Sequence, residues 1–294
     1  MISVVIPTHD RPALLTRAVQ SVQAQTFRDL EILVVDDASV CPAEEVLAGV
    51  SDPRLKVLRS ARGIGASAAR NMGWRAARGE FIAFLDDDDA FLPVFLEKLL
   101  LKMQGAPVSV GVVYGGIKFL DDQGAVIRES IPRYRGNIYK KFLRGEKDAN
   151  IMVLVRRACL ERVNGFDESL KSCQDWDLLL RLSVLYDVEC VMDILGVCYC
   201  HGGQLSGDIS TLIAGRTRMV EKHRAAFAED SSVLCIHLKR LGKMHIINGT
   251  HEEAFRWFHE AAVLNPLEWV KIGAWLAVHY VGEWFNKYIW MVKK

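Results

Sequence analysis

Four consecutive aspartates, Asp86 to Asp89, follow an apolar segment that ends at Leu85. Carboxylate oxygens are hard ligands that suit magnesium and manganese. Two of them one residue apart can share a divalent cation and leave positions for diphosphate oxygens. Four adjacent acids without a counter-charge repel one another, and a bound cation would remove that repulsion. The run therefore predicts a divalent-cation site. The alternative is an acidic turn that caps the following helix.

Two other clusters carry groups suited to a nucleotide. Asp36 and Asp37 follow a short apolar run, where a carboxylate can accept hydrogen bonds from a ribose hydroxyl or a base N–H. A capping or turn role is an equal alternative for them. The Arg-Gly-Ile-Gly turn at residues 62–65 opens a helical pattern and could approach a phosphate, although its glycine spacing does not match the dinucleotide fingerprint. Arg70, further along that pattern, could supply a fixed cation to the diphosphate or base.

Two residues in the second half of the chain could take part in the chemistry. Asp175 lies beside Trp176 at the start of an expected helix, where an indole neighbour could raise its pKa to a value suited to a general base. An acid in a first helical turn is also ordinary. His201 follows an expected strand and precedes two glycines, so it could reach a metal or phosphates. A surface or core histidine is the alternative.

The elements that must position these residues show in the spacing of apolar side chains. Over about the first 120 residues the spacing alternates between strand and helix periods, which predicts βαβ units and a parallel sheet. Expected strands span residues 2–6, 31–35, 55–58 and 81–85, and expected helices span residues 13–25, 66–78 and 92–103. Pro7 is expected to close the first strand, and Pro93 to lie in the first turn of the last helix.

Ligands of such sheets bind at the carboxyl ends of the strands, where the connecting loops gather. Residues 8–11, 36–39 and 86–89 all follow expected strands. We therefore expect these three polar loops to converge on one edge of the sheet.

The rest of the chain is predicted to be mixed and then helical. Expected strands span residues 111–114, 118–120, 126–128, 151–155 and 188–199, with a helix at 175–186. From about Gly207 the pattern is helical, and residues 248–266 are similar to one hairpin of a tetratricopeptide-like repeat. The expected organisation is a domain at residues 1–206, with halves 1–115 and 116–206, followed by a helical region at 207–294.

The composition limits the classes of function. Half of the 294 residues are hydrophobic and the formal net charge is +1, which indicates a globular protein with no global field to recruit nucleic acid. Seven cysteines without a CxxC spacing suggest reduced thiols in the cytoplasm. The N-terminal segment lacks the basic leader and the long apolar run of a signal peptide.

The C-terminal tail is rich in aromatic residues. Five of the seven tryptophans lie beyond residue 256, and the apolar stretch 269–292 is interrupted by Lys271, Glu283 and Lys287. Those charges argue against a membrane-spanning helix. The tail is expected to lie at a membrane surface as a peripheral segment, with tryptophan at headgroup level and lysine near anionic lipid. The alternative is packing on its own domain or on another subunit of an oligomer.

Five motifs, in this order, resemble those of family 2 glycosyltransferases over about the first 200 residues. They are Val4-Val5-Ile6-Pro7-Thr8, Val34-Val35-Asp36-Asp37-Ala38-Ser39, Ala69-Arg70-Asn71-Met72-Gly73, Phe84-Leu85-Asp86-Asp87-Asp88-Asp89 and Asp175-Trp176-Asp177-Leu178. The resemblance implies an α/β GT-A fold: a Rossmann-like nucleotide-binding half within a mixed sheet, joined to an acceptor-binding half. A C-terminal helical extension would follow it.

The resemblance also implies roles for individual residues. Asp86 and Asp88 would form the DxD motif and hold Mn²⁺ or Mg²⁺, with Asp88 the foremost direct ligand. His201, from its position at the strand end and not from the resemblance, is expected as a further metal ligand. Asp175 would be the catalytic base that deprotonates the acceptor hydroxyl. The residues expected to contact the nucleotide are Pro7, Thr8, Asp10, Arg11, Asp36, Asp37, Arg70, Asp86 and Asp87. The sequence departs from the family pattern at Gly63, where many relatives have asparagine, and at Gln174, where an acid is usual.

The expected function is that of an inverting, metal-dependent hexosyl- or N-acetylhexosaminyltransferase. It would use a nucleotide-diphosphate sugar, foremost a UDP-sugar, and a hydroxyl of a glycan or lipid-linked acceptor in cell-surface polysaccharide synthesis. One rival is a catalytically silent nucleotide-sugar-binding scaffold. Another is a sugar nucleotidyltransferase, although residues 7–11 lack the glycine-rich, basic loop common in that class. The expected location is cytoplasmic, at the inner face of the membrane.

Overall fold

The structure is a computed structural model that describes residues 1–146, 151–200 and 208–278. It contains two compact units, Met1–Gly207 and Asp208–Lys294. His201, expected as a metal ligand, and the part of the aromatic tail beyond residue 278 lie outside the described residues.

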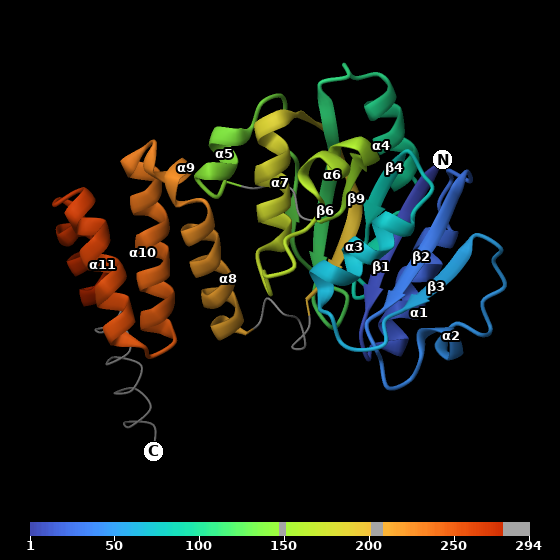
Figure 1. Cartoon of the computed structure of the whole chain (residues 1–294), viewed down its shortest axis with the longest axis horizontal. Coiled ribbons are helices and arrows are strands. Elements are labelled where there is room, and N and C mark those ends of the chain that lie inside the picture. The colour runs from blue at the N-terminus through green and yellow to red at the C-terminus, as the bar shows by residue number, and fades with distance from the viewer. Residues whose placement is uncertain (147–150, 201–207, 279–294) are drawn as a thin grey trace. The chain divides into compact units, whose positions relative to one another are not determined.

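The first unit is built on one mixed sheet of nine strands (Figure 1). The strands are β1 Ile2–Thr8, β2 Leu30–Asp36, β3 Leu55–Arg59, β4 Phe81–Phe84, β5 Ala90–Phe91, β6 Val110–Leu120, β7 Val126–Ser130, β8 Val153–Arg156 and β9 Asp187–Tyr199. Their order is β3-β2-β1-β4-β8-β6-β9-β5, and β7 pairs with β6. The first four strands in this order are parallel, as expected, while β8 runs antiparallel to both β4 and β6.

The helices of this unit connect the strands. They are α1 Pro12–Gln23, α2 Ala43–Val46, α3 Ala66–Ala76, α4 Phe95–Gln104, α5 Tyr139–Leu143, α6 Arg157–Val163 and α7 Gln174–Leu185. Val4 and Val34 pack with Leu15 of α1 in one core cluster. Their chain neighbours Val5 and Val35 instead contact α3. Because successive strand residues point to opposite faces, α1 and α3 cover opposite faces of the sheet.

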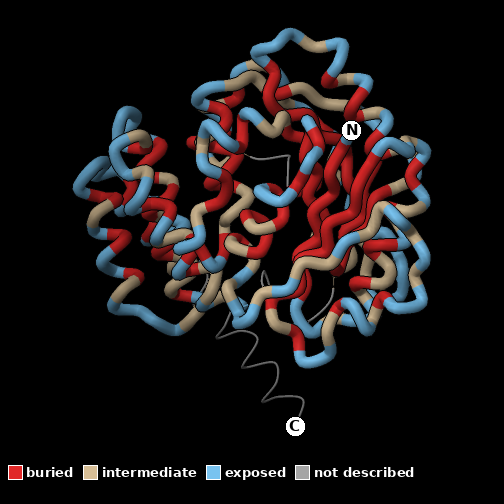
Figure 2. Tube along the Cα trace, turned by 45° about the vertical axis from the view of Figure 1, so that its right-hand side comes forward, coloured by how far each residue is buried: buried red, intermediate tan, exposed pale blue. Residues whose placement is uncertain are grey.

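Burial of both faces explains why the central strands are continuous apolar runs rather than alternating ones. All seven residues of β1 and all seven of β2 are buried, and Figure 2 shows these strands as unbroken buried tubes. Their carboxyl ends are therefore fixed by the core, which is what a precise site at that edge requires.

The prediction that Pro7 closes the first strand is wrong. The strand β1 continues through Pro7 to Thr8, paired with Val35 and Asp36 of β2. Proline lacks an N–H, and the missing donor would point to the side of β1 that faces β4, as the backbone of Val5 does. Pairing with β4 ends at Val5 and Leu85, so no hydrogen bond is lost.

Two other boundaries differ from the expected ones. The helix expected from residue 92 begins at Phe95, because the backbone N–H of Leu92 donates to Leu195 and keeps the preceding segment extended in β5. The strands expected at 111–114 and 118–120 are the single strand β6, which crosses the boundary expected between two halves at residues 115 and 116. Its pairing with β9 shifts register at Gly115 and Gly116, where the absence of a side chain permits a bulge.

The second unit is helical in its described residues. Its helices are α8 Ile209–Lys222, α9 Arg224–Ala228, α10 Ser231–Ile247 and α11 His251–Leu264, and residues 268–278 are also helical. Residues 248–266, expected to hold a hairpin, contain α11 alone. Its hairpin partner is α10, and the two pack closely where Gly242 meets the ring of Phe258. Among the described helices, none has both the length and the apolar character needed to cross a bilayer.

The turn between α3 and β4 predicts a sensitive position at Gly79. Its N–H donates to Ser3 Oγ at 2.8 Å, and a Cβ there would lie 2.7 Å from the Ser3 backbone nitrogen. Gly79→Ala should therefore lower the free energy of unfolding by about 1–3 kcal/mol, the usual cost of overpacking, as measured by urea denaturation. Gly49→Ala is the control, because nothing lies within 4 Å of a Cβ there. Equal stability of the two variants would contradict this packing.

Candidate active site

The three polar loops meet at the carboxyl edge of the sheet. The hydroxyl of Thr8 donates to Asp87 Oδ2 at 2.7 Å, which joins the end of β1 to the aspartate turn. The backbone N–H of Asp37 donates to the Thr8 carbonyl at 2.9 Å, which joins β1 to the end of β2. Arg11 contacts both Asp87 Oδ1 and Asp88 Oδ2 at 3.1 Å. Residues far apart in the sequence thus form one continuous polar edge.

Asp36 is fully buried and holds the loop that follows β2. Its carboxylate accepts hydrogen bonds from the backbone N–H groups of Ser39 at 2.8 Å and Ala43 at 3.0 Å, and pairs with Arg59 at 2.6 Å. Burial alone would raise its pKa, but these hydrogen bonds and the guanidinium charge outweigh burial and lower the pKa. These contacts show that Asp36 holds the loop, and a contact between Asp36 and the nucleotide remains a prediction.

Asp37 occupies the amides that had been expected to meet a phosphate. Its two carboxylate oxygens accept from the N–H groups of Ile64 at 2.6 Å and Gly65 at 2.8 Å. Gly65 has a positive φ of 84°, which glycine adopts at little cost. The glycine-rich turn therefore anchors on β2 rather than presenting these two amides to a ligand. A contact between Asp37 and the nucleotide remains a prediction.

Asp10 turns the loop after β1. Its φ is 52°, in the left-handed region that aspartate tolerates better than most residues. Its backbone N–H donates to Ser39 Oγ at 3.0 Å, and its Oδ1 accepts from the Val40 N–H at 2.6 Å. The side chain remains 42% exposed, which leaves its carboxylate accessible to a ligand.

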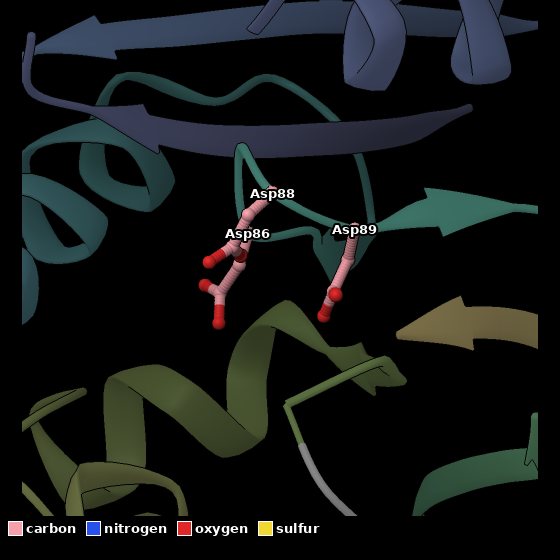
Figure 3. Close-up of side chains that lie close together, drawn as sticks. All are labelled: Asp86, Asp88 and Asp89. Atoms are coloured by element: carbon pink, nitrogen blue, oxygen red, sulfur yellow. The ribbon is translucent and has the colours of Figure 1, made fainter. Parts of the chain in front are cut away.

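Three carboxylates of the aspartate turn lie close enough to share a cation. Asp86, Asp88 and Asp89 each offer an oxygen, and these oxygens all lie within 4.8 Å of one another. Figure 3 shows the three side chains projecting from the turn to the same side. Asp87 instead points to Thr8 and Arg11. The donor set, three hard oxygens with concentrated negative charge, fits Mn²⁺ or Mg²⁺.

The sequence pattern did not identify Asp89 as a ligand. It is buried, and it accepts hydrogen bonds at 3.3 Å from Cys198 Sγ and from the backbone N–H of Tyr199, at the end of β9. Burial raises its pKa well above the ordinary value, and the charges of Asp86 and Asp88 raise it further. Burial also raises the pKa of Asp87 to about 6, against the opposing effects of Thr8 and Arg11. A nearby cation would favour the ionised forms.

Arg17 also supports the aspartate turn, and sequence spacing did not reveal it. This residue lies on α1, and its Nη2 donates to the backbone carbonyl of Asp88 at 2.5 Å. Its guanidinium lies 3.5 Å from the centre of the Tyr199 ring, a cation–π arrangement. Arg17 thereby ties the turn to both α1 and the end of β9. An arginine on an amphipathic helix gives no sequence signal of such a role.

Arg70 links the aspartate turn to the helix that carries Asp175. It is nearly buried, forms an ion pair with Asp86, and donates from Nη1 to Gln174 Oε1 at 3.4 Å. The ring of Phe166 lies 5.5 Å below its guanidinium. The first turn of α7 and the acidic turn therefore lie on either side of one side chain. This is the proximity that a shared site demands.

The first turn of α7 has buried and accessible sides. Trp176 is buried and donates from its indole N–H to the Phe142 carbonyl at 2.9 Å, so the ring anchors the helix in the core. Asp177 is fully buried and pairs with Arg181 at 2.7 Å. Gln174 and Asp175 remain half-buried. The indole is thus part of the core, whereas Asp175 is partly exposed, and its role as a base remains a prediction.

A groove of about 950 Å³ lies elsewhere, along the outer face of α3. Its lining includes Arg62, Ala68, Met72, Arg75 and Glu168, and none of the four aspartates of the turn. The chemical groups described above therefore define the candidate site better than this groove does.

Comparisons with known proteins identify the family of the chain. The family described as Glycosyl transferase family 2 matches residues 3–169. An uncharacterized glycosyltransferase of Methanocaldococcus jannaschii is 30% identical over 187 residues, which are 62% of this chain and 64% of that protein. The Escherichia coli UDP-Glc:alpha-D-GlcNAc-diphosphoundecaprenol beta-1,3-glucosyltransferase WfgD is 29% identical over 187 residues, 64% of this chain and 70% of that protein. The match thus spans less than two thirds of the archaeal relative.

Solved structures confirm the expected fold class. TarS of S. aureus (residues 1–349, in complex with UDP-GlcNAc) is similar with a TM-score of 0.66 and 18% identity, over 90% of this chain and 81% of that chain. The mannosyltransferase PcManGT from Pyrobaculum calidifontis, in complex with GDP-Man and Mn²⁺, has a TM-score of 0.60 and 18% identity, over 95% of this chain and 79% of that one. The fold is GT-A with a helical C-terminal region.

The three-carboxylate cluster predicts that metal-dependent nucleotide binding requires Asp89 as well as Asp88. Asp88→Ala and Asp89→Asn should each weaken UDP binding in the presence of Mn²⁺ by about tenfold or more, or at least about 1.4 kcal/mol, because each removes a negative oxygen from the cation. Isothermal titration with and without Mn²⁺ measures this effect. Asp122→Asn, at an exposed turn, is the matched control. Unchanged affinity in both variants would remove the cluster from metal binding.

Proposed function

The chain belongs to glycosyl transferase family 2, and on that basis we propose that it is an inverting transferase. It would move a hexosyl or N-acetylhexosaminyl group from a nucleotide-diphosphate sugar, foremost a UDP-sugar, to a hydroxyl of a glycan or lipid-linked acceptor. The observation that carries the proposal is Arg70, which contacts both Asp86 and Gln174. This contact supports the proposal because it joins the expected donor-binding turn to the first turn of the helix that carries the expected base.

The choice of donor and acceptor rests on the relatives. The name of WfgD specifies UDP-Glc as donor and a sugar on diphosphoundecaprenol as acceptor, and TarS has been solved with UDP-GlcNAc. A polyprenol-linked glycan intermediate of cell-surface polysaccharide synthesis is therefore the acceptor class that we propose. The seven cysteines form no disulfide, which is consistent with the cytoplasmic side of the membrane.

The residues of the aspartate turn would bind the donor diphosphate. Asp86, Asp88 and Asp89 would hold Mn²⁺ or Mg²⁺, which when bound supplies positive charge to the diphosphate leaving group. Thr8 and Arg11 hold Asp87 and thereby fix the shape of the turn. Arg70, bound to Asp86, keeps a positive charge beside the turn. These residues orient the donor rather than react with it.

Asp175 would remove the proton from the acceptor hydroxyl. As the acceptor oxygen attacks the anomeric carbon, its proton passes to the Asp175 carboxylate. The bond from that carbon to the diphosphate breaks, and the nucleoside diphosphate leaves. The attack comes from the face opposite the diphosphate, so one displacement inverts the anomeric configuration. The buried indole of Trp176 and the Asp177–Arg181 pair hold the first turn of α7 in place, which positions the base without further reorganisation.

Asp175→Asn tests the role of the base. The amide cannot take a proton but has nearly the same shape, so turnover should fall at least ~100-fold, the lower range for general-base catalysis. UDP and Mn²⁺ affinity should remain unchanged. Asp193→Asn is the matched control, because that acid is half-exposed and pairs only with Lys98 among the contacts described for it. Near-normal turnover of Asp175→Asn would assign the proton transfer to another group.

The products of the wild-type reaction separate the rival functions. Incubation with UDP-sugars and Mn²⁺ should release UDP slowly by donor hydrolysis, and the anomeric configuration of a transferred sugar can be read by NMR. A nucleotidyltransferase would instead interconvert UTP and a sugar 1-phosphate with UDP-sugar and pyrophosphate. A silent scaffold would bind UDP-sugar without releasing UDP. Either result would overturn the proposed function.

A further inference from the structure

The C-terminal unit exposes a stripe of apolar side chains along its last described elements. Leu267 is 70% exposed, Val270 is 72% exposed and Val278 is 74% exposed. The stripe, called here the apolar stripe, consists of Phe255, Val263, Leu264, Leu267, Trp269, Val270 and Val278, all of them at least 38% exposed. Large contiguous apolar surfaces are rare on soluble monomers and mark binding sites.

Helix spacing and one ring contact connect residues of the apolar stripe on α11 with Trp269. On α11, Phe255, His259 and Val263 follow one another at four-residue spacing and share a helix face. The ring of Trp269 then lies 6.4 Å from the ring of His259 in an edge arrangement. This contact joins the outer face of α11 to the helical segment 268–278.

The opposite side of segment 268–278 packs against the other helices of the second unit. Ile272 is buried in a cluster with Ile246 and Phe258. Glu268 is buried and paired with Lys239, and also with Lys271 at 2.9 Å. The helix is therefore fixed to α10 and α11 through its inner side, which leaves Val270 and Val278 pointing away from the core. The side chains of the apolar stripe on this segment are therefore exposed although the helix itself is packed on its neighbours.

The charge beside the apolar stripe selects the kind of partner. Lys271 has a side chain that is 67% exposed. From residue 271 to the C-terminus the sequence has four lysines and one glutamate, Glu283, and so a net charge of +3. The same stretch adds Tyr280, Trp284, Tyr288 and Trp290. This composition, rich in aromatic residues and lysine, matches the interface of an anionic bilayer. A second copy of the chain would carry the same positive charge in this stretch and be repelled.

We propose that the apolar stripe docks on the surface of an anionic phospholipid bilayer, lying in the interface rather than spanning the membrane. Val270, Val278 and Leu267 would insert among the acyl chains, with Trp269 at headgroup level and Lys271 next to lipid phosphates. The purpose of docking rests on the proposed function, since a polyprenol-linked acceptor lies in the same membrane. The docking itself does not depend on catalysis.

A vesicle assay with a matched control tests this proposal. The full chain is sedimented with phosphatidylcholine vesicles and with vesicles that also contain phosphatidylglycerol. Val270→Glu combined with Val278→Glu should weaken binding to the anionic vesicles at least tenfold, because each substitution replaces an apolar side chain that would enter the acyl chains by a negative charge that anionic lipid repels. Val108→Glu is the control, since Val108 is 88% exposed but lies in the first unit. Circular dichroism checks that all three proteins are folded.

Three results would overturn the proposal. The first is equal binding by the double variant and the control. The second is equal binding to neutral and anionic vesicles. The third is that the wild-type chain does not bind vesicles but self-associates in sedimentation velocity, and that the double variant does not self-associate. That result would make the apolar stripe an interface between copies. Release of UDP from UDP-sugar without vesicles is measured in parallel. If vesicle binding is absent but UDP is released, the docking proposal fails and the proposed function stands. If vesicles are bound but no UDP is released, the docking proposal stands and the proposed function fails.

Discussion

Burying a carboxylate costs free energy unless it finds hydrogen-bond donors or a counter-charge, and the carboxyl edge of this sheet buries Asp36, Asp37, Asp87, Asp88 and Asp89 together. Arginines near the edge supply the counter-charge that these carboxylates need. Arg59 pairs with Asp36, Arg11 with Asp87 and Asp88, and Arg70 with Asp86. The polar contacts between the loops supply the hydrogen bonds and positive charge that the buried acids need. The same contacts set the geometry of the site.

That compensation is divided between two groups of acids. Asp36, Asp37 and Asp87 have both oxygens engaged by donors of the protein, so they hold the loops in place. Asp86, Asp88 and Asp89 present oxygens to one another, and Asp89 also accepts hydrogen bonds from Cys198 and Tyr199. Because their mutual repulsion is only partly relieved by arginines, this second group keeps an affinity for positive charge. A rigid acidic frame thus surrounds a smaller acidic group that remains suited to a cation.

The sequence predicted the parts of this arrangement that depend on local spacing. The alternation of strand and helix periods located all four parallel strands, and the rule that loops gather at their carboxyl ends brought Thr8, Asp37 and Asp87 together before any coordinates. Those contacts join residues as far as 79 positions apart, yet topology alone implied them. The DxD spacing similarly drew attention to Asp86 and Asp88.

The remaining details depend on packing that spacing does not encode. Asp89 is held in place by β9, which returns to it 109 residues later, and Arg17 reaches the turn from α1. Spacing alone does not reveal that Trp176 is buried and bonded to the Phe142 carbonyl. Pro7 illustrates the effect of such packing on the site. Without an N–H on the side where β4 turns away, β1 cannot recruit another strand there. The pairing of β1 with β4 therefore ends at Val5 and Leu85, and Thr8 at the end of β1 bonds to the side chain of Asp87.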